Sequence, residues 1–380
     1  MKYNVGAGFL EVDVVTDLEE FKSLRRRWNL LAAESGASIF QTWEWAWCWW
    51  QRYGKGKRLW LHIVQNNNQL VGIAPLYISN SYYGLPLKVV AFIGTNATDY
   101  LNFICKQDDP EVVAALADGL LSATNWDAID LHQVPDGSLV ASILKNVAAY
   151  KGFFFKQIDQ DICYKLSLPD SWEEYLACLS KKFRWNIQYY LRRLNRDHAI
   201  SFRLSEKSIV NRDIELFFKL HQKRFLSKKK PGAYLTPSFR RFHLELAMTL
   251  SENDWLRLYF LEIDGKPVAT LYGFQFADSF YYYLGGFEPD WGSLSVSTVL
   301  IAKAIEDSIA SGLNSFDFLR GEEPYKQKWL AQPFVNHRLI ISGSGKKSEL
   351  ARKLLVLEND LTKRAKGKVS QLSAPGPICV

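Results

Sequence analysis

Two stretches of the chain repeat one order of hydrophobic and polar positions. Arg58–Gly84 reads as strand, polar turn and strand, and Leu256–Gly286 reads the same way with a third strand added. Residues 264–265, Asp-Gly, are a strong signal for a two-residue hairpin turn. Three asparagines at 66–68 occupy that place in the first stretch. Both stretches are therefore predicted to be antiparallel hairpins.

The repeat extends beyond the hairpins. Setting Gly72 against Ala269 gives an offset of 197 residues, which also places the helical pattern of Leu18–Ala33 on Glu215–Lys230. Further along, a helix leads into a strand in both copies: Glu111–Thr124 into Asp127–Val134, and Ser297–Ser311 into Ser315–Gly321. This order predicts an α+β fold of two pseudo-symmetric halves, each with a central mixed sheet flanked by helices.

The boundary between the halves is predicted between Phe153 and Ser171, where two strand patterns are followed by a turn at 168–171. Ser171 and Glu174 form a capping box that opens a helix through about Cys178. We therefore divide the chain into residues 1–165, 166–345 and a basic tail, 346–380. The tail is expected to hold an amphipathic helix over 348–365 and to be disordered or loosely packed over 371–380.

Composition fits a folded protein with a large core. Apolar residues make up 48% of the chain and charged residues 23%. The chain also has 13 Trp and 18 Tyr, which indicates either dense aromatic packing or a groove for an extended or sugar-like ligand.

The basic excess is local. The net charge of +7 comes largely from Lys181–Arg196 and Lys223–Lys230. Such patches either are solvated helix faces or attract phosphate-bearing ligands: a nucleotide cofactor, tRNA, a nucleotide sugar or an anionic membrane surface. No DNA-binding motif is present, so tRNA or peripheral membrane contact are the partners that these patches suggest.

Cysteine usage indicates a reducing compartment. The five cysteines are odd in number and lack metal-ligand spacing, so we expect neither disulfides nor a metal. The first residues do not resemble a secretory signal, and no window reaches the ~18–20 apolar residues of a membrane span. The expected location is the cytoplasm.

Candidate catalytic side chains are concentrated in Asn314–Leu330. Phe316 and Phe318 alternate with Asp317 in a strand pattern, and Gly321 then frees the backbone before a charged and aromatic cluster. Asp317 points away from its two phenyl neighbours, so it is either a base in a cleft or an ion-pair partner of Arg320 and Lys326. Glu322 is the rival base.

This segment resembles a known signature. Its D-x-x-x-G-x-x-x-Y-K-x-x-W pattern, formed by Asp317, Gly321, Tyr325, Lys326 and Trp329, is similar to that of the CelD-like branch of GNAT acyltransferases, found in cellulose and exopolysaccharide clusters. Three further patches resemble that branch: Ser38–Trp50, Thr98–Phe103 and Leu179–Leu194. More distantly, the chain is similar to Fem-type peptidoglycan-bridge peptidyltransferases, which also have two GNAT-like halves.

The resemblance implies direct acyl transfer to an amine without a covalent enzyme intermediate. The reaction needs donors for a pyrophosphate, a group that polarises the carbonyl, a base for the amine proton and an acid for the thiolate. Lys326 matches the lysine regarded as central in Fem-type relatives, and we expect its ammonium at the cleft mouth with Tyr325 as the acid. The alternative is that Tyr325 and Trp329 pack together and Lys326 faces solvent.

The expected donor site lies after strand Phe280–Leu284. A glycine-containing turn before a helix N-terminus offers free N–H groups to phosphate. The residues assigned to donor binding are Gly285, Gly286, Gly292, Ser295, Ser297 and, on the basic helix, Arg184. The loop lacks most glycines of the usual Q/R-x-x-G-x-G/A pattern, so we expect weak acyl-CoA binding; capping of the helix by Ser295 or Ser297 is the alternative.

The residues assigned to acceptor binding are Gln41, Trp43, Glu44, Asp99, Tyr100 and Trp329. A stripe of Trp43, Trp47 and Trp50 is also explained by packing between the halves. The sequence therefore predicts a GNAT-type acyltransferase that uses acyl-CoA or another carrier-linked donor and a sugar or amine acceptor, without a metal. The alternatives are an aminoacyl-tRNA-dependent peptidyltransferase and a non-catalytic assembly partner of polysaccharide machinery.

Overall fold

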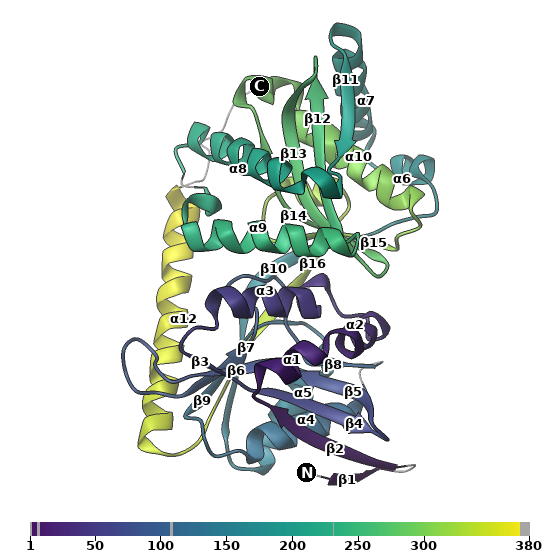
Figure 1. The fold of residues 1–380 in the computed structure, drawn as a ribbon. Helices are drawn as coiled ribbons and strands as arrows, with labels where there is room; N and C mark the ends of the chain where they lie inside the picture. The colour runs from purple at the N-terminus through teal and green to yellow at the C-terminus, as the bar shows by residue number, and fades with distance from the viewer. Residues whose placement is uncertain (1, 6–7, 107–108, 231, 373–380) are drawn as a thin grey trace.

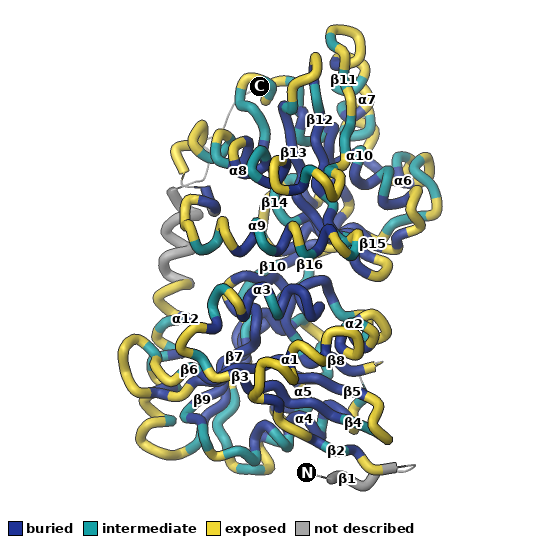
Figure 2. Tube along the Cα trace, viewed as in Figure 1, coloured by how far each residue is buried: buried dark blue, intermediate teal, exposed yellow. Residues whose placement is uncertain are grey.

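The structure, a computed structural model, describes residues 2–5, 8–106, 109–230 and 232–372. Two halves lie one above the other, the N-terminal half below and the C-terminal half above (Figure 1). Buried residues follow the sheets of both halves and the layer where the halves meet (Figure 2). The predicted α+β fold with two related halves is confirmed by the element order given below.

The N-terminal half supplies the following elements: β1 (Lys2–Val5), β2 (Gly8–Val15), α1 (Leu18–Ser23), α2 (Arg25–Glu34), a short 3-10 turn (Ile39–Gln41), α3 (Trp43–Tyr53), β3 (Lys57–Leu59), β4 (Leu61–Asn66), β5 (Gln69–Ala74), β6 (Leu76–Ser79), β7 (Val89–Phe92), β8 (Ile104–Cys105), α4 (Pro110–Ser122), β9 (Ala128–Pro135), α5 (Leu139–Tyr150) and β10 (Phe154–Ser167).

The C-terminal half supplies α6 (Trp172–Cys178), α7 (Lys181–Asp197), β11 (Ile200–Leu204), α8 (Val210–Ser227), α9 (Pro237–Glu252), β12 (Leu256–Ile263), β13 (Lys266–Phe276), β14 (Ser279–Phe287), α10 (Val296–Ala310), β15 (Ser315–Arg320), α11 (Tyr325–Lys328), β16 (Gln332–Ser342) and α12 (Lys346–Leu372), with 3-10 turns at Lys207–Ile209, Ala233–Leu235 and Pro289–Leu294.

The two hairpins are copies of each other in fine detail. Asn67 and Asn68 have φ of 49° and 63°, and Asp264 and Gly265 have φ of 50° and 74°, as a type I′ turn requires. The predicted offset also holds in the pairing registers Val64↔Gly72 and Leu261↔Ala269, and a β-bulge follows each of these pairs. A duplicated hairpin explains why the turn and the bulge fall at matching positions.

The halves exchange their last strands. The N-terminal β10 pairs with β15 as well as with β16, and the C-terminal β16 pairs with β9. The result is one 11-stranded sheet in the order β11-β12-β13-β14-β15-β10-β16-β9-β7-β6-β3. A 5-stranded sheet, β1-β2-β4-β5-β8, continues the N-terminal half. The boundary predicted after residue 165 falls inside β10, two residues before its end.

Strands β3 and β4 are separated only by Trp60, and β5 and β6 only by Pro75. Proline lacks the N–H that continues a ladder, so the hairpin breaks here and divides between the two sheets.

Two parallel strand pairs open at corresponding places. Strands β7 and β9 pair only at Val89↔Ala128 and Val90↔Ile129. Strands β14 and β15 pair only from Ser279↔Ser315 to Tyr281↔Asp317. Beyond these short ladders the two strands of each pair no longer form a ladder.

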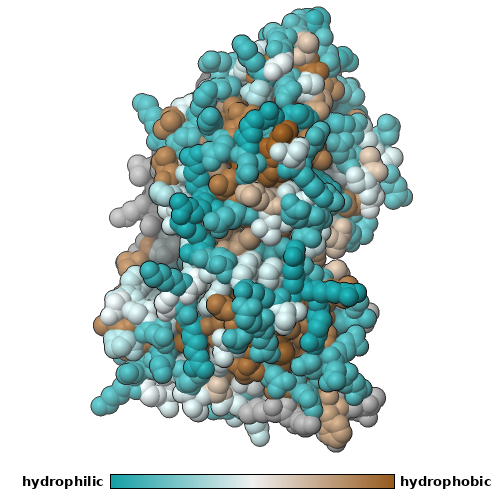
Figure 3. Space-filling view, viewed as in Figure 1, coloured by the Kyte–Doolittle hydropathy of each residue, from teal (hydrophilic) through white to brown (hydrophobic). Residues whose placement is uncertain are grey.

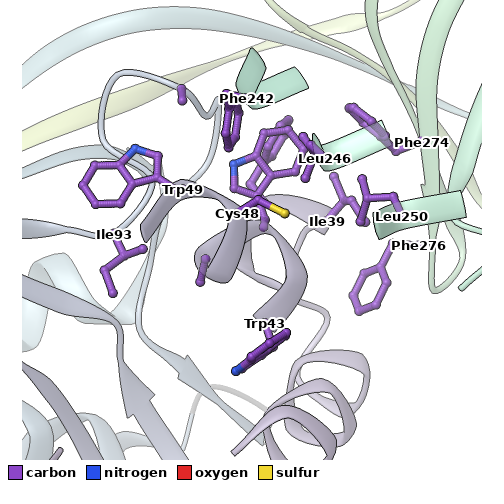
Figure 4. Close-up of a cluster of buried hydrophobic side chains, with 14 of the residues drawn as sticks. Ile39, Trp43, Cys48, Trp49, Ile93, Phe242, Leu246, Leu250, Phe274 and Phe276 are labelled. Carbon is purple, nitrogen blue, oxygen red and sulfur yellow. The ribbon is translucent and has the colours of Figure 1, made fainter. Parts of the chain in front are cut away.

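An aromatic layer joins the halves. Trp45 on α3 is fully buried, with its ring 5.9 Å from Phe242 on α9 and 5.4 Å from Phe274 on β13. Figure 4 shows α3 with Cys48 and Trp49 facing Phe242, Leu246 and Leu250 of α9. The stripe predicted for this contact was wrong in part, because Trp43 instead stacks on Trp47 at 5.2 Å, on the side of α1.

Helix α12 runs along one side of the molecule (Figure 1). Its Glu358 accepts from Arg338 of β16 at 2.7 Å and from Tyr82 at 2.7 Å. The predicted tail helix is confirmed and is longer than expected, since it extends from Lys346 through Leu372. Of residues 371–380, predicted to be disordered or loosely packed, Gln371 and Leu372 instead belong to α12, and 373–380 lie outside the described residues.

Hydrophilic side chains cover most of the face in Figure 3, with apolar patches on both halves. Within the described part of the chain, no helix is long and apolar enough to cross a membrane.

Candidate active site

Asp317 stands where two parallel strands part. It is the last residue of β15 that pairs with β14, opposite Tyr281. The backbone then leaves extended geometry, with Leu319 at φ 59° and Gly321 at φ 117°. A non-glycine residue at positive φ is uncommon, so the chain accepts a strained turn directly after this carboxylate.

The surroundings of Asp317 raise the affinity of its carboxyl group for a proton. Its Oδ1 accepts from the Tyr100 hydroxyl at 2.9 Å and from the Leu319 amide at 2.7 Å. Burial raises the pKa of Asp317 to about 7, against the opposing effect of these hydrogen bonds and of Lys165. A carboxyl that is half ionised near neutral pH is suited to take up a proton from a substrate.

Neither expected cation neutralises Asp317. Arg320 instead pairs with Asp99 at 2.9 Å, and Lys326 pairs with Glu323 at 3.0 Å. Of the two roles left open by the sequence, the ion pair with Arg320 and Lys326 was wrong. The geometry leaves Asp317 facing a cavity.

A cavity of about 440 Å³ lies between the halves and contains Asp317 in its wall. The cavity is lined by Ser35, Gly36, Ala37, Ser38, Gln41, Tyr100, Asn102, Phe103, Cys105, Pro135, Asp136, Lys165, Tyr281, Asp317 and Phe334. Tyr100 and Phe334 stack with ring centroids 5.7 Å apart and form one aromatic wall. We call this space the inter-half cavity. Its mixture of aromatic and hydrogen-bonding groups suits a small polar ligand.

A second cavity, of about 150 Å³, lies by the N-terminus of α10. It is lined by Phe183, Arg224, Tyr282, Ser297, Thr298, Ile301, Tyr325, Lys328 and Trp329. Tyr281 lines the first cavity and its neighbour Tyr282 lines the second, and successive strand residues point to opposite faces. The two cavities therefore lie on opposite faces of β14. We call the second space the α10 cavity.

The N-terminus of α10 has no side-chain cap and is a candidate anion-binding position. Ser295 precedes it in the left-handed conformation at φ 50°. In contrast, Asp109 caps the corresponding helix α4 by accepting from Glu111 and Val112. The free amides and the helix dipole of α10, with the cationic Arg224 and Lys328 in the same wall, suit an anionic group. The N-terminal half offers no such arrangement at α4.

The carboxylate that corresponds to Asp317 in the N-terminal half has the opposite electrostatics. Asp130 lies two residues after Ala128, as Asp317 lies two residues after Ser315 at the start of the matching ladder. Burial opposes ionisation of Asp130, but His132 and a two-pronged contact from Arg338, at 2.7 and 2.9 Å, lower its pKa. Asp130 is therefore a permanent anion within an ion pair, and the proton-accepting arrangement exists in the C-terminal half.

Lys326 does not lie where the sequence placed it. Its side chain is 2% exposed, and its ammonium donates to the carbonyls of Leu319, Arg320 and Gly321 at 2.8–3.1 Å. The expectation of an ammonium at the cleft mouth, like that of a solvent-facing lysine, was wrong. Lys326 holds together the turn that follows Asp317.

Of the other two predicted catalytic residues, Tyr325 lines a cavity and Glu322 does not. Tyr325 lines the α10 cavity and makes a hydrogen bond with Tyr282, and burial raises its pKa, so the phenol stays neutral. Glu322 is exposed in the loop before α11 and lines neither cavity. Their catalytic roles stay predictions.

The predicted donor glycines are packing residues. Gly285 and Gly286 belong to β14, and a Cβ on Gly286 would lie 2.3 Å from the His221 backbone of α8. Only Ser297 of the six predicted donor-binding residues lines the α10 cavity. Arg184 donates to the Leu176 carbonyl at 3.2 Å, and Gly292 lies in the 3-10 turn before α10. The free phosphate turn expected at 285–286 was wrong, because α8 packs against that strand.

Three of the six residues predicted to bind the acceptor line a cavity, and three do not. Gln41 and Tyr100 line the inter-half cavity, and Trp329 lines the α10 cavity. Asp99 pairs with Arg320, and the buried Glu44 accepts from Arg25, Asn29 and Asn253. Trp43 and Glu44 line neither cavity. The prediction that they contact a ligand was therefore wrong for these two cavities.

Sequence reasoning missed several lining residues. Lys165 and Phe334 reach the inter-half cavity from the exchanged strands β10 and β16, and Arg224 reaches the α10 cavity from α8. The alternation in the 14-residue β10 was a usable signal for Lys165, but nothing local indicated its pairing opposite Asp317.

Comparison with known proteins identifies the fold. Residues 181–327 match the family described as "Acetyltransferase (GNAT) domain". The crystal structure of FemX covers 87% of this chain and 96% of its own, with 11% identity and a TM-score of 0.66. A conserved protein of unknown function from Bacteroides thetaiotaomicron VPI-5482 covers 88% of this chain and 100% of its own, with 11% identity and a TM-score of 0.52. None of the curated proteins compared with the chain matches its sequence. Residues 181–327 of the C-terminal half are therefore similar to a GNAT domain, and the whole chain shares its two-part α+β fold with FemX.

Proposed function

We propose that this tandem GNAT protein transfers an acyl group from a thioester donor to an amine or hydroxyl acceptor, with Asp317 as the general base. The observation that carries the proposal is the position of Asp317. This carboxyl, which has a pKa of about 7 and no ion-pair partner among the described residues, lies where β14 and β15 stop pairing and lines a cavity between the halves.

The reaction assigns one reactant to each cavity. The acceptor lies in the inter-half cavity, where the Asp317 carboxylate takes its proton while its nitrogen or oxygen attacks the acyl carbon. The carbon–sulfur bond then breaks and the thiolate leaves on the side of the α10 cavity. There the neutral Tyr325 phenol is a hydrogen-bond donor for the thiolate.

The α10 cavity suits a donor phosphate. The uncapped helix N-terminus, Arg224 and Lys328 supply the donors, and Ser297 and Thr298 supply hydroxyls. A space of about 150 Å³ encloses only part of a large carrier such as acyl-CoA. The remainder would lie outside it, and the weak acyl-CoA affinity expected from the sequence stays a prediction.

A direct test compares Asp317→Asn with Glu322→Gln, the rival base. The purified protein is given acyl-CoA and a panel of amino sugars and amino acids, and the acylated product is measured by mass spectrometry. We expect Asp317→Asn to lose at least ~100-fold in turnover and Glu322→Gln to keep it, since a positioned base contributes ~10²–10⁴-fold. The opposite pattern would transfer the role to Glu322.

Aminoacyl-tRNA is the second candidate donor. The supporting observation is the basic helix α7, which lies beside the α10 cavity. Its Phe183 lines that cavity, and its lysines and arginines could bind the phosphates of a tRNA. Charged tRNA that supports turnover where acyl-CoA fails would favour a Fem-type peptidyltransferase. Failure of both donors with a folded protein would favour the non-catalytic assembly role.

We also propose a cellular setting, which rests on two features of the sequence. The resemblance to the CelD-like branch supports a role in exopolysaccharide or cell-envelope synthesis with a sugar-like acceptor. The cysteine pattern supports the cytoplasm as the site of action.

A further inference from the structure

Helix α7 presents a large aromatic surface to solvent. Ile187 and Leu194 are buried on its inner side, which packs against α10. On its outer side Trp185 is 53% exposed and Tyr189 is 36% exposed. All 13 tryptophans lie in the described part of the chain, and Trp185 is the only one of them whose side chain is largely exposed. The other twelve indoles are buried at least in part, so the exposed Trp185 and Tyr189 together distinguish this helix surface.

Cations surround the exposed indole. At 3.6 residues per turn, positions 181, 185, 189, 192 and 196 follow one face of the helix. The exposed cations of this face and its borders are Lys181, Lys182, Arg192, Arg193 and Arg196. Asp197 is the single acid of α7, and it pairs with Arg196 at 2.7 Å. We call the cations together with Trp185 and Tyr189 the α7 face.

We propose that the α7 face docks the protein on an anionic membrane surface. Tryptophan and tyrosine are the side chains that prefer the boundary between headgroups and acyl chains. Lysine and arginine stems lie along such a boundary while their charged ends reach the lipid phosphates. The face therefore complements a negatively charged bilayer in both its apolar and its charged parts.

Two observations favour a membrane over a nucleic acid. The rings of Trp185 and Tyr189 stack on each other, with centroids 4.8 Å apart and planes 12° apart, so each covers a face that a base would need for stacking. These residues also belong to a single helix, α7, at the edge of the C-terminal half (Figure 1), and one face of a helix can lie along a planar surface.

Docking would bring the chemistry close to the bilayer. On the inner side of the same helix, Phe183 lines the α10 cavity and contacts Trp329 with ring centroids 4.8 Å apart. A helix is about 10–12 Å across with its side chains, so the α10 cavity would lie about one helix width from the surface. This placement suits a reactant that is held in a membrane. The docking itself is independent of the proposed acyl transfer.

The test is cosedimentation of the full-length protein with vesicles. One vesicle contains phosphatidylcholine alone and the other also contains phosphatidylglycerol. We expect binding to the anionic vesicles only, and release as salt rises from 0.1 M to 1 M, since the Debye length falls from about 10 Å to about 3 Å.

Variants locate the contact. Trp185→Ala should weaken binding several-fold. Arg192→Gln with Arg193→Gln should weaken it about thirty-fold, since each cation near such a surface contributes roughly 1 kcal/mol and 1.4 kcal/mol is tenfold. The matched control is Tyr150→Ala with Lys145→Gln on α5, where the tyrosine is 91% exposed, and it should bind like the wild type.

Several outcomes would overturn the proposal. They are an absence of vesicle binding, equal binding to neutral vesicles, or equal loss in the control variant. Binding of tRNA with the same dependence on Trp185, in the absence of vesicle binding, would instead assign the α7 face to RNA. Because no outcome involves turnover, a failure of the proposed acyl transfer would leave this test intact.

Discussion

Two aspartates at corresponding places show how neighbours decide the use of a carboxyl group. Asp317 on β15 and Asp130 on β9 are both buried, and each strand precedes the exchanged strand of its half. Arg338 and His132 fix Asp130 as an anion, whereas Asp317 has hydrogen bonds from Tyr100 and Leu319 but no cation within ion-pair distance among the described residues. The duplicated fold therefore has one copy of this position in an ion pair and one copy with a raised pKa.

The pH dependence of turnover should follow Asp317. The base must be ionised, so kcat/KM should rise tenfold per pH unit below about 7 and level off above it. In Tyr100→Phe the carboxylate loses one stabilising donor, and its rise should shift to higher pH. Rate profiles between pH 5 and 9 check both statements. A wild-type profile that is flat across this range would remove Asp317 as the base.

Substituting Lys326 should damage the fold before the chemistry. In Lys326→Met three carbonyls lose a charged donor, which should cost about 3 kcal/mol or more of the free energy of unfolding. Urea unfolding measures this loss, and Lys328→Met, at an exposed lysine two residues away, is the control for stability. A Lys326→Met protein of normal stability and ~100-fold lower turnover would restore the catalytic role that the sequence suggested.

The candidate site was predictable where its residues are local. Asp317, Tyr325 and Trp329 belong to one sequence motif. Asp317 lines the inter-half cavity, and Tyr325 and Trp329 line the α10 cavity. The placement of Lys326 was wrong because the sequence cannot show that the turn after β15 curls around the ammonium. Lys165 was missed because its position opposite Asp317 depends on strand pairing across about 150 residues.

At the level of elements, short-range signals determined what could be predicted. The Asp264-Gly265 turn, the Ser171 cap and the basic helix starting at Lys181 all appear as expected, since each depends on a few neighbouring residues. The strand exchange and the close approach of α8 to Gly286 were not predicted, because they depend on contacts between distant segments.

The N-terminus of α10 offers a test in which stability and donor binding change in opposite directions. Ser297→Asp places a carboxylate in the first helical turn, which should stabilise the helix by about 0.3–1 kcal/mol through its dipole. The same charge in the α10 cavity should weaken binding of a phosphate-bearing donor roughly fivefold or more, because like charges at close range repel. Thermal unfolding and calorimetry with acyl-CoA measure the two effects.

The uncharged Ser297→Asn variant is the control, and it should change donor affinity much less than Ser297→Asp. If Ser297→Asp bound the donor as tightly as the wild type, the phosphate would have to lie away from α10.

At the level of the whole molecule, the exchanged strands make the two halves one folding unit. Strand β10 pairs with β16 from Phe154↔Ser342 to Lys165↔Gln332 and with β15 on its other edge. The aromatic layer of α3 and α9 adds a second contact between the halves. Unfolding either half alone would expose both the unpaired strand edges and this layer.

We therefore expect a single cooperative transition in urea, although the chain contains two GNAT-like halves. Tryptophan fluorescence reports mainly on the N-terminal half and the layer between the halves, where most of the indoles lie, and far-ultraviolet circular dichroism reports on the whole chain. The two curves should coincide. A fragment of residues 1–167 should lack a cooperative transition, because its β9 and β10 lose their β16 partner. Two separated transitions, or a fragment that unfolds cooperatively alone, would show that the halves fold independently in spite of the shared sheet.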